Sequence, residues 1–347
     1  MKKAVIALLG LTLITSCKKD KSVIPPGQFD NGILVLNEGL YQQNNASISY
    51  YDYTSAQVTQ EVFYNKNNRA LGDVANDMDK YSILDSTYII MAVDLSSQIE
   101  IVNARTFQSV AQIPIFNGTT AREPRHVQVY GLRAYTCNYD GTVSVIDLLA
   151  NEVVNTISVG SNPDGMAMVN GYLYTANSGG LNWPVYDSTI SVIDLNSETV
   201  VSTIPSRVNC SRMLVDAQGD IYVVSNGNYS NVAPAMLRLN TQTNVITNEY
   251  SVSIGSWSLY NDYIYFHDTD NQGIYRFNTT TETFEGTKLI DVSSYQSMYA
   301  VQVTENYIIT ADANGYTNSS TVRVYNLQGV LEYQFTAGFL AKEFIVG

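Results

Sequence analysis

The sequence has 347 residues, a formal net charge of −13 at pH 7 and 45% hydrophobic residues. That hydrophobic content is sufficient for a folded core and excludes an intrinsically disordered chain. The negative charge argues against nucleic acid as a partner, because proteins that bind nucleic acids present a basic surface to the phosphates.

Residues 1–16 are predicted to be a signal peptide. Lys2 and Lys3 precede the apolar run Ala4–Leu13, which is too short to span a bilayer. The run ends in LITSC (13–17), which resembles a bacterial lipobox. The resemblance implies cleavage before Cys17 and attachment of diacylglycerol to its sulfur. The alternative is an ordinary secretory signal followed by an incidental cysteine.

Residues 17–30 are predicted to comprise the lipidated Cys17 and a flexible tether. Acyl chains on this cysteine would hold the protein at a membrane surface without a spanning helix. Removal of the signal peptide takes away two lysines and leaves a formal charge of −15. The predicted partner at this end of the chain is therefore a membrane, reached through a lipid anchor.

The first β-strands are predicted at Gly32–Asn37, Ser47–Asp52 and Val58–Phe63. These runs are rich in β-branched and aromatic residues and are separated by turn residues. A clearer unit lies at 159–204, where MAMV, YLYTAN, ISVID and VVSTI form four strand-like runs in succession. Such a sheet needs copies of itself to pack against.

Copies are indicated by an Asp or Asn that recurs at the end of the third strand-like run. The seven positions are Asp52, Asn103, Asp147, Asp194, Asn240, Asn278 and Asn326. Their spacing varies between 38 and 51 residues. A short side-chain acceptor at this point folds back onto the following backbone N–H groups and closes the turn. The pattern predicts an all-β fold, a seven-bladed β-propeller of four-stranded antiparallel blades over residues 31–347.

The first unit contains only three strands before the next repeat begins near Asn76. The last segment, KEFIV (342–346), matches the rhythm of RHVQV (125–129) and GMAMV (165–169), which are predicted innermost strands. We therefore expect the C-terminal strand to complete blade one and close the ring, which removes an open sheet edge.

Long, irregular loops are expected to share one face of the propeller, and binding sites are commonly built on such loops. Aromatic residues there could stack on a flat ligand, and arginine or asparagine could contact its anionic or amide groups. We expect roughly half of these residues to pack onto neighbouring loops instead. The candidate ligand-binding residues are Tyr41, Tyr64, Asn67, Arg69, Arg122, Arg125, Trp183, Tyr186, Tyr229 and Tyr316.

No catalytic residue, metal ligand or cofactor is predicted. The sequence contains no GxSxG, HExxH or phosphate-binding glycine loop. Cys137 and Cys210 are expected to be free thiols, since elements two blades apart rarely come within disulfide reach. His126 and His267 are expected to be structural residues with hydrogen-bond partners.

A family resemblance accompanies these observations. Residues 159–204 resemble the YVTN-type repeat, apart from an inserted loop at Leu181–Tyr186. The segments NEG (37–39), NNASISYYD (44–52) and EVFYNKNNRALGDVANDM (61–78) resemble Bacteroidetes surface-layer or YncE-like propeller lipoproteins. Some relatives in that group cap the outer-membrane vitamin B12 transporter and bind cobalamin. The resemblance implies an outer-membrane location, expected at the cell surface. The periplasmic side stays open because KKD (18–20) only partly resembles surface-export signals.

Three functions are weighed. The first is a non-enzymatic ligand-capture module, with a corrinoid as candidate ligand and a TonB-dependent transporter as partner. The second is an adhesion or protein–protein scaffold that binds glycan or another envelope protein. The third is a metal-dependent, lactonase-like hydrolase with its metal in the central channel, for which no supporting motif is visible.

Overall fold

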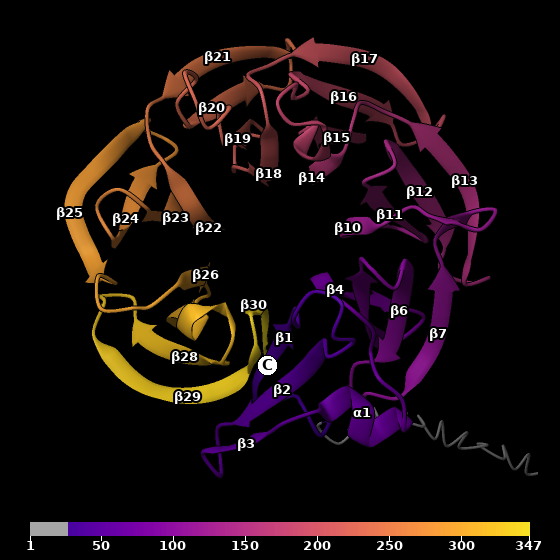
Figure 1. Cartoon of the computed structure of the whole chain (residues 1–347), viewed down its shortest axis with the longest axis vertical. Helices are drawn as coiled ribbons and strands as arrows, with labels where there is room; N and C mark the ends of the chain where they lie inside the picture. The colour runs from indigo at the N-terminus through magenta and orange to yellow at the C-terminus, as the bar shows by residue number, and fades with distance from the viewer. Residues whose placement is uncertain (1–26) are drawn as a thin grey trace, which may run out of the picture.

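The computed structural model describes residues 27–347, which form a ring of seven four-stranded antiparallel sheets around a central channel (Figure 1). The predicted seven-bladed propeller is confirmed. The expected signal peptide (1–16), Cys17 and the tether up to residue 26 lie outside the described residues. No helix within residues 27–347 is long and apolar enough to cross a membrane.

Within each blade, the strands follow one another from the channel to the outer rim of the ring. Blade one consists of β30 (Ala341–Val346), β1 (Gly32–Asn37), β2 (Ser47–Asp52) and β3 (Gln57–Thr59). Blade two consists of β4 (Ala75–Ile83), β5 (Ser86–Val93), β6 (Gln98–Asn103) and β7 (Ser109–Pro114). Blade three consists of β10 (Pro124–Tyr130), β11 (Arg133–Asn138), β12 (Thr142–Asp147) and β13 (Glu152–Ser158). Blade four consists of β14 (Pro163–Val169), β15 (Tyr172–Asn177), β16 (Thr189–Asp194) and β17 (Thr199–Pro205).

The remaining blades follow the same order. Blade five consists of β18 (Cys210–Val215), β19 (Ile221–Ser225), β20 (Ala235–Asn240) and β21 (Val245–Tyr250). Blade six consists of β22 (Ile254–Tyr260), β23 (Tyr263–Asp268), β24 (Gly273–Asn278) and β25 (Thr283–Asp291). Blade seven consists of β26 (Met298–Val303), β27 (Tyr307–Asp312), β28 (Ser319–Asn326) and β29 (Leu331–Phe339). Between blades or within loops lie α1 (Val62–Asn67), β8 (Phe116–Asn117), β9 (Thr120–Ala121), η1 (Gly180–Asn182) and η2 (Asn314–Tyr316).

All seven predicted Asp or Asn residues end the third strand of a blade. In each, Oδ1 accepts a backbone N–H two or three residues further on. In blade four, Asp194 accepts from Asn196 N at 2.9 Å and from Ser197 N at 2.8 Å. The repeat signal therefore has the local cause predicted from the sequence.

The ring is closed as predicted. β30 pairs antiparallel with β1, with Leu34 opposite Ile345, and Gly347 N donates to Gly32 O at 3.0 Å. Figure 1 shows the C-terminus beside β1. The innermost strand of blade one thus comes from the other end of the chain, and no blade keeps an open inner edge.

The predicted third strand Val58–Phe63 is wrong. β3 ends at Thr59, and α1 follows with Val62 and Phe63, each 1% exposed. Both side chains join a buried cluster that includes Phe29 and Phe107. Successive residues of a strand point to opposite faces, so a strand would bury only one of the two. The helix allows both to pack at the junction of blades one and two.

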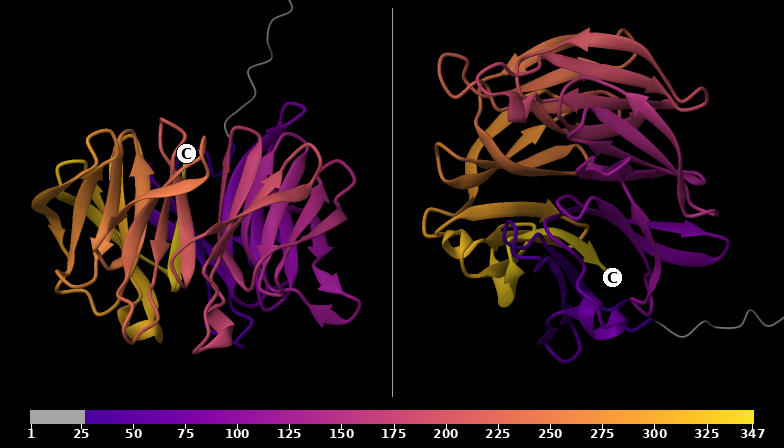
Figure 2. Two further views of the ribbon diagram at one scale, coloured as in Figure 1. Left: turned by 90° about the horizontal axis from the view of Figure 1, so that it is seen from above. Right: turned by 45° about the vertical axis from the view of Figure 1, so that its right-hand side comes forward.

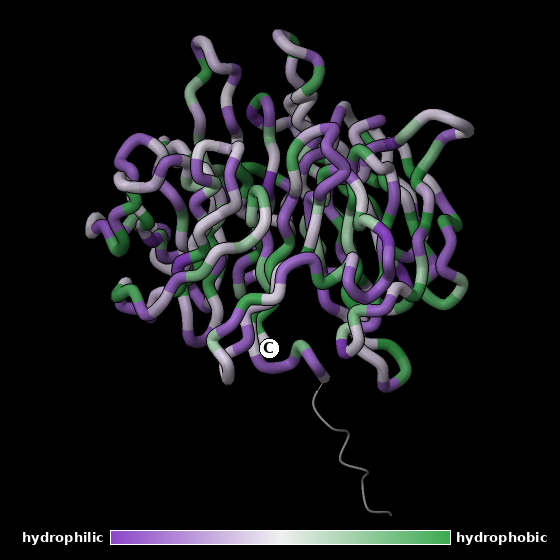
Figure 3. The backbone as a smooth tube through the Cα atoms, turned by 60° about the horizontal axis from the view of Figure 1, so that its bottom comes forward, coloured by the Kyte–Doolittle hydropathy of each residue, from purple (hydrophilic) through white to green (hydrophobic). Residues whose placement is uncertain are grey.

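The hydrophobic core is divided among the junctions between blades. Seven buried clusters occur in residues 27–347, and each combines residues of two adjacent blades. For example, one cluster joins Tyr135 and Cys137 of blade three to Met166 and Leu173 of blade four. Figure 3 accordingly shows hydrophobic stretches in all parts of the ring. Because the blades pack side by side, the central channel remains free for polar residues.

The two faces of the ring differ. The loop face carries the loops at 37–46, 178–188, 226–233 and 313–320, and the innermost strands start there. The turn face carries the seven Asp or Asn turns. Gln28 N donates to Arg105 O, in the turn after Asn103, at 3.2 Å, so the described chain begins on the turn face. β30 also ends on that face, opposite the loops that carry η1 and η2 (Figure 2).

Candidate functional site

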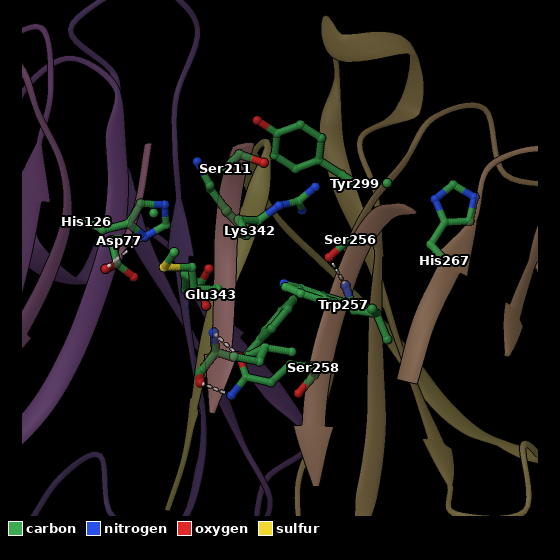
Figure 4. Close-up of a pocket in the computed structure, with 18 of the residues that line it drawn as sticks. Asp77, His126, Ser211, Ser256, Trp257, Ser258, His267, Tyr299, Lys342 and Glu343 are labelled. Carbon is green, nitrogen blue, oxygen red and sulfur yellow. Dashed lines mark hydrogen bonds and ion pairs between the residues drawn. The ribbon is translucent and has the colours of Figure 1, made fainter. Parts of the chain in front are cut away.

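The central channel contains a cavity of about 1170 Å³. All seven innermost strands contribute residues to its wall, and several loop-face residues, including Asn226, Tyr295 and Tyr316, line its entrance. Figure 4 shows side chains from opposite sides of the ring pointing into this space. A cavity of this size is a common setting for a small-molecule site.

A β-bulge occurs near the start of every innermost strand. In each blade the pairing register shifts by one residue at this point. Bulges change the direction of a side chain and are frequent beside functional sites. The bulge residues are Asn76, Arg125, Asp164 with Gly165, Ser211 with Arg212, Gly255 with Ser256, Tyr299, and Lys342. We call the loop-face end of the channel that these residues form the channel mouth.

One part of the channel mouth is held by a shared acidic residue from the loop face. Tyr299 Oη donates to Glu38 Oε2 at 2.5 Å, and Lys342 Nζ lies 3.1 Å from the same oxygen. Lys342 Nζ also donates to Asn76 Oδ1 at 2.9 Å. These contacts connect the bulges of blades seven, one and two.

The connection continues through Asp94, which is buried. Its Oδ2 accepts from Asn76 Nδ2 at 2.9 Å and from Arg125 Nη1 at 2.5 Å. Arg125 Nε donates in turn to Asp164 Oδ1 at 3.0 Å, and its guanidinium lies 4.3 Å from the centre of the Tyr139 ring. Burial opposes ionisation of Asp164, but the nearby positive charge of Arg125 prevails and lowers the pKa of this carboxyl.

These interactions make a continuous arc from Tyr299 through blades one, two and three to Asp164. We call it the linked arc. Every charged bulge residue in it has a partner of opposite charge. Such pairs fix side chains in place when their remaining polar atoms are also bonded.

The rest of the channel mouth, in blades five and six, is different, and we call it the open arc. Arg212 forms no ion pair with any residue of 27–347 in the structure. Its hydrogen bond to Ile254 O, from Nη2, is long at 3.4 Å. Burial lowers the pKa of this guanidinium, against the opposite effects of Asp164 and Glu343. Arg212 therefore keeps most of its five N–H donors available to the cavity.

His267 belongs to the same arc and corrects the expectation of a histidine with satisfied hydrogen bonds. It is 5% exposed, and neither ring nitrogen has a partner. The ring lies against Gly255, where an added Cβ would be 2.5 Å from Nδ1. Burial lowers the pKa of His267 to about 4, so the imidazole is neutral near pH 7.

Deeper in the channel, acidic residues face one another. Burial and the charge of Asp77 raise the pKa of Glu343 to about 8. Asp77 Oδ2 accepts from Val127 N at 2.8 Å and lies 3.3 Å from His126 Nδ1. Figure 4 shows Asp77, His126 and Glu343 on one side of the cavity. In contrast to His267, His126 thus has a partner, as expected.

Of the predicted ligand-binding residues, Arg125 and Tyr316 line the cavity. Tyr316 is 52% exposed and its ring makes an edge contact with Tyr299 at 6.1 Å. Three others are held in internal contacts. Arg69 pairs with the buried Glu100. Arg122 pairs with Asp140, and Asn67 bonds the backbone of Phe63, Phe107 and Ser109.

The other five predicted residues lie outside the cavity wall. Trp183 and Tyr229 are 72% and 76% exposed on the loops of blades four and five, and Tyr186 contacts Tyr229 edge-on at 6.2 Å. Tyr41 and Tyr64 are exposed in blade one and α1. Their role in binding stays a prediction.

The sequence reasoning missed most of the channel mouth. The bulge residues share a position in the repeat but not a chemical type, so no motif links them. Aligning the seven repeats at the residues that follow each interblade loop would have collected them. No group of three or more His, Cys, Asp or Glu side chains within residues 27–347 is arranged to hold a metal ion. Cys137 and Cys210 are free, as predicted, and both are buried.

Solved structures share this fold at low sequence identity. A quinonprotein alcohol dehydrogenase-like protein from Bacteroides thetaiotaomicron is 11% identical with a TM-score of 0.65, covering 92% of this chain and 78% of that one. Hydrazine synthase from Kuenenia stuttgartiensis is 15% identical with a TM-score of 0.57, covering 69% and 73%. The computationally designed Ika8 protein is 10% identical with a TM-score of 0.53, covering 77% and 88%. These likenesses concern the fold alone.

A search of the curated proteins gives no match. The family described as a domain of unknown function (DUF5074) matches residues 31–283, which extend from the start of blade one to the beginning of β25 in blade six. This match spans well over half of the chain, and the chain therefore belongs to the DUF5074 family.

Proposed function

We propose that this protein is a non-enzymatic ligand-capture module and that the channel mouth is its binding site. The observation that carries the proposal is a difference in ion pairing within the channel mouth. The charged bulge residues of the linked arc are paired, whereas Arg212 in the open arc has no ion pair among the described residues. Together they border a cavity of about 1170 Å³ whose entrance carries Tyr316. A prearranged polar site with spare donors is suited to a ligand that supplies the missing acceptors.

The position of the chain start supports a membrane-bound orientation. Gly27 lies on the turn face, and the ten steps from Cys17 to Gly27 span at most about 36 Å. A lipid on Cys17 would therefore hold the turn face toward the membrane and leave the channel mouth facing away. Palmitate labelling of the protein tests the anchor, and Cys17→Ser should abolish the label and release the protein from membranes.

The candidate ligand is a corrinoid, delivered to a TonB-dependent transporter at the outer membrane, with the cell surface as the proposed side. A corrin ring carries amide arms, which could bond the hydroxyl and amide groups of the entrance, and a flat surface, which could stack on Tyr316. The corrinoid comes from the family resemblance of the sequence, whereas the site comes from the geometry of the channel.

The experiment is gel filtration of the mature, detergent-solubilised protein with cyanocobalamin. A coloured protein peak is expected, weakened by Tyr316→Ala and unchanged by Trp183→Ala. Both residues are exposed aromatics on loop-face loops, but only Tyr316 lines the cavity. A larger effect of Trp183→Ala would move the site to the loops of blades four and five.

A colourless peak would remove the corrinoid and would leave the capture of another ligand to be tested. Native mass spectrometry of protein purified gently from its own membranes should then reveal a bound small molecule. If the protein is empty there as well, the capture proposal fails.

A second candidate, an adhesion or protein–protein scaffold, is favoured by one observation. Leu181, Trp183, Val185 and Tyr229 are each more than 60% exposed on neighbouring loops of blades four and five. Exposed apolar residues in such proximity commonly mark an interaction surface. Cross-linking in intact cells should then capture a glycan or envelope protein, and Trp183→Ala should abolish that cross-link without changing the channel.

A further inference from the structure

The linked arc stops at Asp164, one blade before Arg212. From Tyr299 to Asp164, each charged bulge residue has a charged partner at 3.1 Å or less. In blade five, Ser211 aligns with Arg125, and Arg212 is the next residue of the same bulge, with only the 3.4 Å bond to Ile254 O. The difference is confined to one side of the channel mouth.

An unpaired cation in the wall of a narrow channel is unfavourable, because the guanidinium loses water contacts without gaining a counter-charge. Its planar fork of N–H donors matches two oxygens of one carboxylate or phosphate. A ligand with an oxyanion would supply the missing counter-charge and would accept hydrogen bonds from the N–H donors of the guanidinium. Arg212 is therefore suited to bind a ligand and has little value as a structural contact.

Further donors surround Arg212. Ser211 Oγ accepts from Asn226 Nδ2 at 3.1 Å, and Ser256 Oγ accepts from Val301 N at 3.0 Å. Because each oxygen already accepts a bond, its hydroxyl hydrogen can donate to a ligand. The neutral ring of His267 has one N–H without an acceptor, but both ring nitrogens are buried beside Gly255. Figure 4 shows Ser211, Ser256 and His267 around the cavity on strands of the neighbouring blades five and six.

The surrounding charges limit how negative the ligand group can be. Asp164 and Glu343 both act electrostatically on Arg212, and Asp77 lies across the channel from it. A doubly charged phosphate would meet these acidic groups, whereas a singly charged carboxylate needs only the one unpaired guanidinium. The open arc thus favours one negative charge presented on two oxygens.

We propose that the open arc is a subsite for a carboxylate group of the ligand, bound by Arg212 with hydrogen bonds from Ser211 and Ser256. The inference rests on the proposed function, in which the channel mouth is the binding site. It adds the chemical class of one ligand group, a carboxylate, which a corrinoid with a free acid arm would carry and which cyanocobalamin, whose arms are amides, lacks.

The protein contains a reporter for this test. It has two tryptophans, of which Trp257 lines the cavity at 7% exposure and Trp183 is 72% exposed outside it. In Trp183→Phe protein, tryptophan fluorescence therefore reports on the channel alone. The probes are benzoate, its neutral analogue benzamide, and inorganic phosphate, each titrated into the full mature chain in detergent.

Benzoate is expected to change the Trp257 fluorescence saturably, with an apparent affinity at least about ten-fold above those of benzamide and phosphate. Arg212→Gln in the same background should lower the benzoate affinity about ten-fold or more and remove the preference over benzamide. Arg122→Gln is the matched control, because Arg122 is paired with Asp140 and does not line the cavity. A melting temperature for each variant verifies that it is folded.

Two results would overturn the carboxylate subsite. One is equal binding of benzoate and benzamide, and the other is an unchanged benzoate affinity in folded Arg212→Gln protein. Tighter binding of phosphate than of benzoate would also refute it. In these cases the channel mouth remains a binding site. If none of the probes acts on Trp257 and no ligand is found by native mass spectrometry, the proposed function itself fails.

Discussion

The linked arc and the open arc are both built around β-bulges of the innermost strands. Each blade has a bulge near the start of its innermost strand, and two of these bulges carry an arginine. Arg125 pairs with two carboxylates, whereas Arg212, one residue further along its bulge, pairs with none. Arg125 therefore contributes to holding the ring together, whereas Arg212 has no ion pair among the described residues and is the proposed contact for a ligand. The comparison teaches that position in a repeat does not determine role, because the neighbours of a side chain decide whether it serves stability or binding.

The largest effect is expected from breaking the linked arc. Asp94→Ala should lower the free energy of unfolding by about 3 kcal/mol, since it leaves the buried Asn76 without its acceptor and the partly buried Arg125 with Asp164 alone. Urea denaturation measures this loss. Asp140→Asn, which weakens the pair with Arg122 at a carboxylate that is 24% exposed against 7% for Asp94, should cost less than about 1 kcal/mol. Equal losses in the two variants would contradict the distinction between buried and exposed pairs.

A second prediction concerns the backbone between the two arcs. An added Cβ on Gly165 would lie 2.2 Å from Ser211 O, so Gly165→Ala must push β14 and β18 apart. We expect a loss of about 1–3 kcal/mol in the free energy of unfolding. Gly286→Ala is the control, because a Cβ there meets nothing within 4 Å. If the two variants denature alike, the blades are not as tightly apposed as described.

The pH dependence of stability should report on Glu343. Its pKa is about 8 in the folded protein against an ordinary value of 4.5, so the folded state holds this proton more tightly than the unfolded state. The stabilisation is complete below about pH 4.5 and is lost as the pH rises toward about 8. Glu343→Gln should therefore gain about 1–2 kcal/mol relative to the natural protein between about pH 5 and about pH 8.

Thermal melts of both proteins across this pH range provide the measurement. Water in the channel reduces the effect below that of a fully buried carboxyl, which is why a modest gain is expected. A parallel pH dependence in the two proteins would show that Glu343 titrates as in the unfolded chain.

The smallest effect is expected in the open arc. Arg212→Met should leave the free energy of unfolding unchanged or raise it by up to about 1 kcal/mol, because it removes a cation without a partner. Chemical denaturation in the absence of ligand is the measurement. A loss comparable to that of Asp94→Ala would mean that Arg212 supports the ring, and the contrast between the arcs would disappear.

The fold was predictable to the extent that its signals are local. Asp194 and its six counterparts close turns onto their own neighbouring N–H groups, so each can be recognised within a few residues of sequence. Ring closure by β30 was predictable because blade one lacked a strand and because KEFIV (342–346) resembles the innermost strands of later blades. α1 was not predictable in this way, because Val62 and Phe63 turn toward Phe29 and Phe107, which lie elsewhere in the sequence.

The site was predictable only in part, for a related reason. Arg125 and Tyr316 were found because they belong to long loops or their ends, where binding residues were sought. Arg212 and His267 lie inside strands, and their lack of partners depends on distant blades. Arg69 looked equally available in the sequence, yet Glu100 from the next blade pairs with it. Arg69 and Arg212 are the same residue type. They differ because the ring places a carboxylate beside Arg69 and none in ion-pair contact with Arg212.

Ring closure has a consequence for the order in which the protein is made. Lys342 and Glu343, two residues of the channel wall, belong to β30, which follows all other strands of the ring in the sequence. The linked arc between blades seven, one and two therefore cannot form until β30 has been synthesised, since Lys342 joins Glu38 to Asn76. A growing chain or a truncated product that lacks β30 has an incomplete channel mouth, so the proposed binding site requires a chain that includes this strand.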